Sequence, residues 1–168
     1  MKGDPMNTSE ENSIPVEESM EQLKRVIRGI PIAMMTTVGS DGKLLSRPMV
    51  TIDAPDEDAL WFFAHDTSQA VRSLVRNPEL NLSYVNPNDE RYVSVAGHAQ
   101  RVLDRDKAVE LWVSDLKDYF PDGVDDPDLV LLRVEVDTAE FWDQLPNWLA
   151  RAFRLNPIFP DRTSPVFS

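Results

Sequence analysis

The chain has 168 residues and a formal net charge of −12, with 42% hydrophobic residues and no cysteine. This length and apolar content are those of one globular domain, whereas the negative charge repels nucleic acid and anionic membrane surfaces. Without cysteine the chain can form neither disulfides nor thiolate metal sites, and two histidines are too few for a three-histidine metal centre.

The first 16 residues are polar and acidic and lack the apolar core of a secretory signal. We expect residues 1–16 to be a flexible tail, because they bury too little apolar surface to offset the entropy lost on ordering. We expect one domain over residues 17–146, and a C-terminal extension over residues 147–168 that packs on it or on a partner subunit. No apolar run approaches the roughly 20 residues that a membrane helix requires. The sequence therefore predicts a cytoplasmic protein that binds neither nucleic acid nor membranes.

A β-hairpin is predicted between Ile32 and Ile52. Two apolar runs, residues 32–38 and 44–52, flank the sequence Gly-Ser-Asp-Gly, whose residues favour a tight turn. In the second run Arg47 shares a sheet face with apolar residues such as Met49, because side chains alternate along a strand. A guanidinium on such a face needs an anionic partner.

The other elements follow from hydrophobic periodicity and turn residues. They are a helix over residues 17–28, an aromatic strand over 60–64, a helix capped by Asp66 or Thr67 and ended by Asn77-Pro78, strands over 80–85 and 91–103, a helix from Asp104 through Leu116, and a strand over 129–136. Gly97, inside a strand, predicts a bulge or a close approach. About six strands with short connections favour an antiparallel sheet that closes into a barrel with peripheral helices, a mainly β (α+β) fold.

Four residues could together bind an anion: Arg47, Thr67, Ser68 and Arg72. The free N–H groups and partial positive charge of a helix start, with hydroxyl donors beside them, suit a phosphate monoester. Each residue also has an ordinary explanation, since Arg47 could pair with a cross-strand carboxylate and Ser68 could simply cap the helix. These alternatives stay open on the sequence alone.

Several aromatic side chains could stack on a planar ring such as an isoalloxazine or a nicotinamide, although packing in a core or a dimer interface is the more ordinary role for each. They are Trp61, Phe62, Phe63, Trp112, Phe120, Phe141 and Trp142. No nucleophile, base and orienting group can be identified as a set, so hydrolase chemistry has no support.

Four features occur in one order along the chain: Ser46-Arg47-Pro48-Met49, Leu60-Trp61-Phe62 with Ser68 following, Gly97 within a strand, and Phe141-Trp142-Asp143. Their joint order resembles that of the pyridoxamine 5′-phosphate oxidase-like split-barrel flavoproteins, and most of all their bacterial general stress protein branch. The resemblance covers approximately residues 23–143.

This resemblance implies an antiparallel split β-barrel that forms a homodimer and binds flavin mononucleotide (FMN) in a cleft between subunits. It also implies that Arg47 and the segment from Ser68 to Ala70 hold the phosphate, while the backbone of residues 49–51 and 63–65 faces the flavin ring. The predicted cofactor-binding residues are Arg47, Pro48, Met49, Val50, Thr51, Phe63, Ala64, His65, Ser68, Gln69, Trp112 and Trp142.

The chain reads Ser68-Gln69-Ala70 where relatives commonly carry a lysine. We therefore expect one phosphate contact fewer, with position 70 facing the phosphate. The implied function is FMN binding with flavin-dependent oxidoreductase activity in a general stress-type role, with a nicotinamide cofactor or another small molecule as reaction partner. The alternatives are non-enzymatic binding or sensing of a flavin or another phosphorylated cofactor, and use of a deazaflavin.

Overall fold

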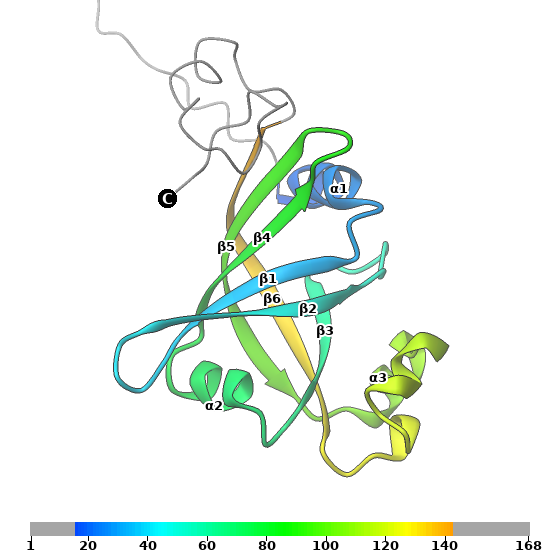
Figure 1. The fold of residues 1–168 in the computed structure, drawn as a ribbon. Coiled ribbons are helices and arrows are strands. Elements are labelled where there is room, and N and C mark those ends of the chain that lie inside the picture. Colours follow the sequence, from blue (N-terminus) through cyan, green and yellow to red (C-terminus); the bar gives the residue numbers. More distant parts are fainter. Residues whose placement is uncertain (1–15, 143–168) are drawn as a thin grey trace, which may run out of the picture.

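The computed structural model describes residues 16–142, and nothing is described for residues 1–15 and 143–168. The predicted C-terminal extension, and all of the predicted tail except Val16, lie outside the described residues. Within them, six antiparallel strands close into a barrel in the order β1-β2-β3-β6-β5-β4 (Figure 1). This architecture confirms the mainly β barrel with peripheral helices that the sequence predicts.

The elements alternate between strands and short helices. Their bounds are α1 (Val16–Ile27), β1 (Ile32–Val38), β2 (Leu44–Ile52), β3 (Leu60–His65), α2 (Gln69–Arg76), β4 (Glu79–Asn86), β5 (Arg91–Val102), α3 (Arg105–Leu111), the 3-10 turns η1 (Ser114–Asp118) and η2 (Gly123–Asp125), and β6 (Leu129–Trp142).

The barrel interior is filled from every strand because each strand alternates its side chains. On β1, for example, Ala33, Met35 and Thr37 point inward and are fully buried. The helices α1 and α2 contribute apolar residues such as Leu23 and Leu74 to the same core. The interior is therefore one continuous apolar cluster with helices against it, consistent with the amphipathic patterns in the sequence.

A second apolar cluster covers the outer face of β3. Trp61 and Phe63 point away from the barrel interior and pack with Leu111, Phe120 and Leu131 under α3 and η1. Both faces of β3 are thus buried, which explains why this strand reads as an uninterrupted apolar run rather than an alternating one.

Two predicted helix boundaries are wrong. The N-cap of α2 is Ser68, whose Oγ accepts a hydrogen bond from the Val71 N–H at 3.3 Å. The predicted caps are engaged elsewhere, because Asp66 pairs with Arg101 and Thr67 bonds to Asp128. The helix predicted from Asp104 through Leu116 ends at Leu111, because Trp112 takes an extended backbone conformation and packs on Phe63.

Gly97 marks a β-bulge, as its place in a strand predicts. The pairing of β5 with β6 shifts register between Ala96 and Gly97. A Cβ at position 97 would collide with the backbone carbonyl oxygen of Glu135. The two strands therefore approach here more closely than a side chain allows.

We expect Gly97→Ala to lower the free energy of unfolding by about 1–3 kcal/mol, because backbone must move to admit the methyl group. Chemical denaturation of the variant and the wild type measures this difference. The control is Gln100→Ala at an exposed position of the same strand, which should change stability by less than about 0.5 kcal/mol. Equal stability of Gly97→Ala and the wild type would contradict the close approach.

Candidate functional site

The strands β2 and β3 are paired over only a short length. Their register joins Thr51 to Phe62 and Ile52 to Trp61, whereas β2 pairs with β1 from Leu44 through Val50. Beyond these two pairs β2 runs away from β3, and α2 lies in the angle between them (Figure 1). Within the described residues, the neighbouring edges of residues 44–50 and 63–65 therefore have no strand partner, and their main-chain N–H and C=O groups can bind a ligand.

Arg47 lies on this open part of β2 and points toward the barrel core. It stands opposite Met35, which is fully buried, and its Nη1 donates to the Oγ1 of buried Thr37 at 3.0 Å. Burial lowers the pKa of Arg47. Within the described residues no carboxylate pairs with Arg47. The cross-strand ion pair that was the alternative explanation for Arg47 therefore does not form among these residues. A half-buried guanidinium with one neutral acceptor can still bind an anion.

The start of α2 is partly occupied by the protein's own groups. The N–H and Oγ1 of Thr67 donate to the carboxylate of Asp128 at 3.0 and 2.9 Å, and Arg72 donates to the Thr67 carbonyl oxygen. The expectation that Thr67 presents free donors to an anion is therefore wrong. Ser68 caps the helix and is half-buried, and its hydroxyl can still donate a hydrogen bond.

Position 70 does not have the environment that we expected. The side chain of Ala70 is 2% exposed and lies on the buried face of α2, whereas Gln69 is exposed. A lysine at position 70 would have to leave the protein interior to reach a phosphate. Alanine fits this position because the helix packs tightly here, and only the structure shows which way the position faces.

His65, at the end of β3, belongs to a hydrogen-bonded network. Its Nδ1 lies 3.2 Å from a carboxylate oxygen of Asp128, and its ring stacks on Phe120 with centroids 4.3 Å apart. Burial alone would raise the pKa of Asp128, but the bonds from Thr67 and the neighbouring imidazole outweigh it and lower that pKa. Asp128 thus holds the imidazole and the start of α2 together as an anion.

The remaining predicted residues of β2 and β3 point to different sides of the sheet. Met49 packs against the core, and the Thr51 hydroxyl shares a hydrogen bond of 2.9 Å with the hydroxyl of buried Tyr84, whose pKa burial raises to about 12. The neighbours of Met49 in sequence, Pro48 and Val50, lie on the outer face. Pro48, Met49 and Val50 lie along the open main-chain edge of β2, whereas Thr51 is paired with Phe62.

The two predicted tryptophans are far apart in one chain. Trp112 packs edge-on against Phe63, with ring centroids 5.5 Å apart. Trp142 is 39% exposed at the end of β6, whose first residue, Leu129, pairs with His65. A strand of this length spans roughly 40 Å. One protomer therefore does not bring Trp142 to the open edges of β2 and β3.

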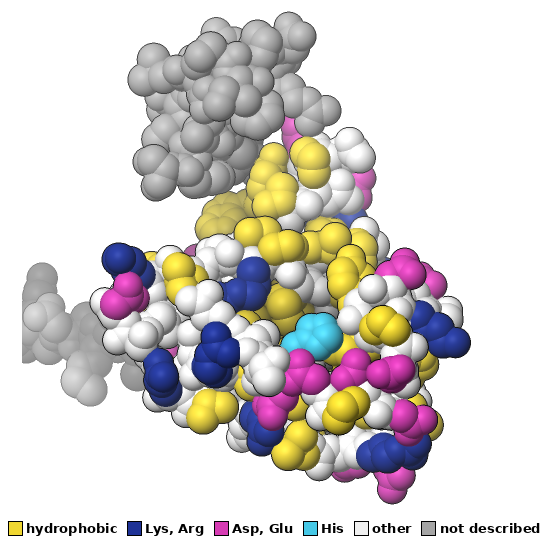
Figure 2. Space-filling view, turned by 60° about the horizontal axis from the view of Figure 1, so that its bottom comes forward, with side chains coloured by type: hydrophobic (Ala, Val, Ile, Leu, Met, Phe, Trp, Pro, Cys, Tyr) yellow, Lys and Arg dark blue, Asp and Glu magenta, His cyan; other side chains and the backbone are white. Residues whose placement is uncertain are grey.

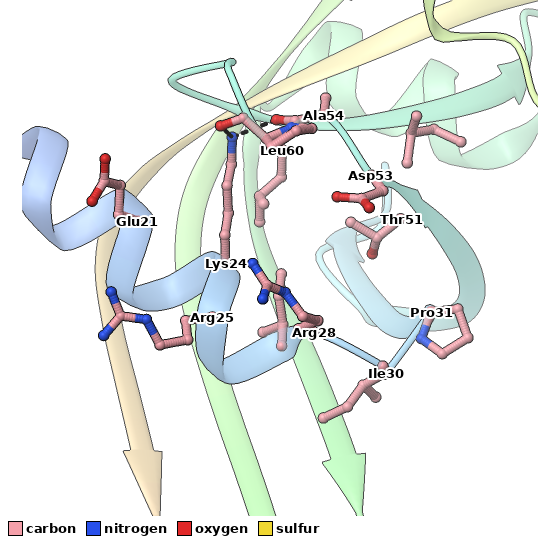
Figure 3. A pocket seen from close by; sticks show the side chains of 14 residues that line it. Glu21, Lys24, Arg25, Arg28, Ile30, Pro31, Thr51, Asp53, Ala54 and Leu60 are labelled. Carbon is pink, nitrogen blue, oxygen red and sulfur yellow. Dashed lines mark hydrogen bonds between the residues drawn. The ribbon is translucent and has the colours of Figure 1, made fainter.

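A separate hollow lies beside α1 and was not predicted from the sequence. Its volume is about 400 Å³, and its walls include Arg28, Thr51 and Asp53 (Figure 3). The Nζ of Lys24 donates to backbone carbonyls of the turn after β2, including that of Ala54 at 2.6 Å, and burial lowers the pKa of Lys24. The only sequence feature that indicated this hollow was the run of basic residues at the end of the helix predicted over residues 17–28.

The face turned to the viewer in Figure 2 brings hydrophobic, basic and acidic side chains together with a histidine. It shows a hollowed area lined by hydrophobic side chains, with basic side chains on one side and a histidine with acidic side chains on another.

Elsewhere, His98 on β5 lies between Glu135 and Asp137, where the hydrogen bond with Asp137 raises the pKa of His98. The described residues contain no group of three or more metal-binding side chains, and no described helix has the length and hydropathy to cross a bilayer.

A family model described as pyridoxamine 5′-phosphate oxidase like matches residues 18–156, most of the chain. The protein belongs to this family. Among relatives, Protein bli-3 of Neurospora crassa is 28% identical over 142 residues, which cover 78% of this chain and 68% of that protein.

Solved structures of similar proteins share the fold. A protein related to general stress protein 26 from Clostridium acetobutylicum has a TM-score of 0.66 at 21% identity, covering 77% of this chain and 92% of that one. General stress protein 26 from Bacillus anthracis has a TM-score of 0.64 at 23% identity, covering 79% and 97%. The general stress FMN/FAD binding protein of Xanthomonas citri has a TM-score of 0.64 at 22% identity, covering 77% and 92%. The split-barrel fold implied by the sequence resemblance is thereby confirmed.

Proposed function

We propose that this protein binds FMN along the diverging edges of β2 and β3, with the phosphate at Arg47. The observation that carries this proposal is the half-buried guanidinium of Arg47, which has a hydroxyl partner but no carboxylate partner within residues 16–142. A phosphate monoester supplies the anionic oxygens that a guanidinium binds best. The hydroxyl of Ser68, at the start of α2, is the second phosphate contact in this proposal.

The open edges of β2 and β3 suit the ring of the same cofactor. An isoalloxazine carries hydrogen-bonding groups on its edge and apolar faces, and the main-chain groups on the free edges of residues 44–50 and 63–65 can bind such an edge. Membership of the pyridoxamine 5′-phosphate oxidase like family supports a flavin, as does the Xanthomonas citri structure described as FMN/FAD binding. The side chains present therefore fit the group.

We propose further that the protein acts as a homodimer. The outer face of β1 and β2 carries apolar side chains at neighbouring register positions, where Ile32 stands opposite Val50 and Met34 opposite Pro48. Ile32 and Met34 are 50% and 43% exposed. A contiguous apolar surface of this kind is uncommon on monomers. A second subunit on this face would also allow Trp142 to reach the site from the partner chain.

The activity that we propose is a flavin-dependent oxidoreduction in the cytoplasm, with a nicotinamide cofactor or another small molecule as electron donor. The flavin would supply the redox chemistry, and this chain would bind it, orient it and restrict water. Mixing the flavin-loaded protein with NADH or NADPH under anaerobic conditions distinguishes an enzyme from a binding protein. Rapid loss of the flavin absorbance indicates an enzyme, whereas unchanged absorbance favours flavin binding or sensing without turnover.

The direct test of cofactor binding is the visible absorption spectrum. We expect protein that has been mixed with FMN and then desalted to retain the visible absorption bands of an oxidised flavin. Retention with FMN but not with riboflavin would support a phosphate site. A desalted protein without flavin bands, together with no change of FMN fluorescence on titration, would contradict the proposed function.

Arg47→Ala should weaken FMN binding by about 10- to 100-fold, because a charge-assisted contact of about 1.5–3 kcal/mol is lost. Riboflavin binding should change little, because riboflavin has no phosphate. Fluorescence titration of both ligands measures the difference, and Arg76→Ala, at an exposed site on α2, is the matched control. If Arg47→Ala weakens both ligands equally, Arg47 has a structural role and does not bind the phosphate.

The wild type should have the mass of a dimer in light scattering at micromolar concentration, and Met34→Asp should shift it toward the monomer. A carboxylate in the middle of a buried apolar face is costly unless it is paired. Val75→Asp is the control, because Val75 is 65% exposed and lies on α2, which is not one of the strands of this face. A monomeric wild type would refute the dimer and the site between subunits.

A further inference from the structure

The network around His65 is more than a helix cap. Asp128 uses one carboxylate to accept hydrogen bonds from the N–H and Oγ1 of Thr67 and to contact Nδ1 of His65. The backbone connects the same groups, since the Ser68 N–H donates to the His65 carbonyl oxygen at 2.9 Å. The imidazole, the carboxylate and the start of α2 therefore form one unit.

Asp128 fixes how the imidazole can be used. With Nδ1 directed at a carboxylate, the neutral ring carries its proton on Nδ1 and leaves Nε2 as an acceptor. Within the described residues, no protein group is bonded to Nε2, and the ring is held from one side by Phe120. Protonation at Nε2 converts that atom into a donor and gives the ring a positive charge.

The charges at this end of the site are unbalanced for a phosphate. A phosphate monoester carries close to two negative charges at neutral pH, and Arg47 supplies one positive charge. Asp128 adds a negative charge at the helix start. The neighbouring Asp66 is neutralised by Arg101 of β5, and Phe120 is uncharged. The guanidinium of Arg72, which donates to the Thr67 carbonyl oxygen, is a fixed positive charge at the start of α2. A proton on His65 adds a further positive charge in direct contact with the carboxylate of Asp128.

We propose that protonated His65, held in place by Asp128, adds a positive charge to the phosphate end of the flavin site and thereby cancels the negative charge of that carboxylate. This inference rests on the proposed function, because it requires a phosphate near the start of α2. It follows that FMN binds more tightly as His65 takes up a proton, whereas riboflavin, without a phosphate, is indifferent. His65 is then a ligand-binding residue, through its side chain as well as its backbone.

The test is the affinity of the full chain for FMN and for riboflavin between pH 6.5 and 8.5, measured by flavin fluorescence. The range stays above pH 6, where the phosphate itself gains a proton. We expect the wild type to bind FMN about three- to tenfold more tightly at pH 6.5 than at pH 8.5. His65→Gln should bind FMN with the same affinity at both pH values.

Two further variants separate charge from structure. Asp128→Asn keeps an acceptor for the Thr67 N–H but removes the negative charge, so it should tighten FMN binding at pH 8.5. Arg72→Gln removes a nearby charge that does not titrate in this range, so any loss of affinity should be the same at all pH values. If His65→Gln fails to fold, the comparison of FMN with riboflavin in the wild type still tests the inference, because only FMN should show the pH dependence.

The outcomes distinguish this inference from the proposed function. If the wild type binds no FMN at any pH, the proposed function fails. If the wild type binds FMN and His65→Gln shows the same pH dependence as the wild type, the phosphate site stands and the role of His65 is refuted. Equal pH dependence for riboflavin and FMN in the wild type would also refute it, because the effect would not involve the phosphate.

Discussion

The structure depends on where the pairing between β2 and β3 stops. The two strands share only two register pairs, after which β2 stays with β1 and β3 stays with β6. Pro48 fits this arrangement, because a proline has no N–H to donate and is tolerated where a strand has a free edge. The barrel remains closed through Thr51 and Ile52, and it gains two open edges beside the start of α2. Every element of the proposed site lies along this divergence.

The electrostatics of the chain make Arg47 unusual. The protein carries a net charge of −12, and several of its arginines, such as Arg101 and Arg133, bind carboxylates. Arg47 faces the core side of β2, where its neighbours are Met35 and the hydroxyl of Thr37, so the carboxylates of the surface do not reach it. In a strongly acidic protein, one inward-facing cation without a carboxylate partner among the described residues is a selective place for an anionic ligand.

Much of the fold was predictable because its signals are local. Apolar alternation gave the positions of the strands, and Gly97 indicated the bulge before the register shift was seen. The site was only partly predictable. Arg47 and Ser68 were proposed as site residues from their type and place, whereas Asp128 was not, since it lies 61 residues from Thr67 in the chain and nothing near it in sequence indicates its partners. The burial of Ala70 was missed for the same reason.

The sequence by itself determined the class of fold, the acidic surface and the need of Arg47 for an anion, because alternation, charge and side-chain chemistry are properties of short segments. Only the tertiary structure decided which donors remain free. Asp128 occupies those of Thr67, Ser68 caps α2, and Arg47 is left without a carboxylate within the described chain. These outcomes depend on contacts between strands and turns that are distant in sequence, and such contacts are set by how the sheet closes and not by local preference.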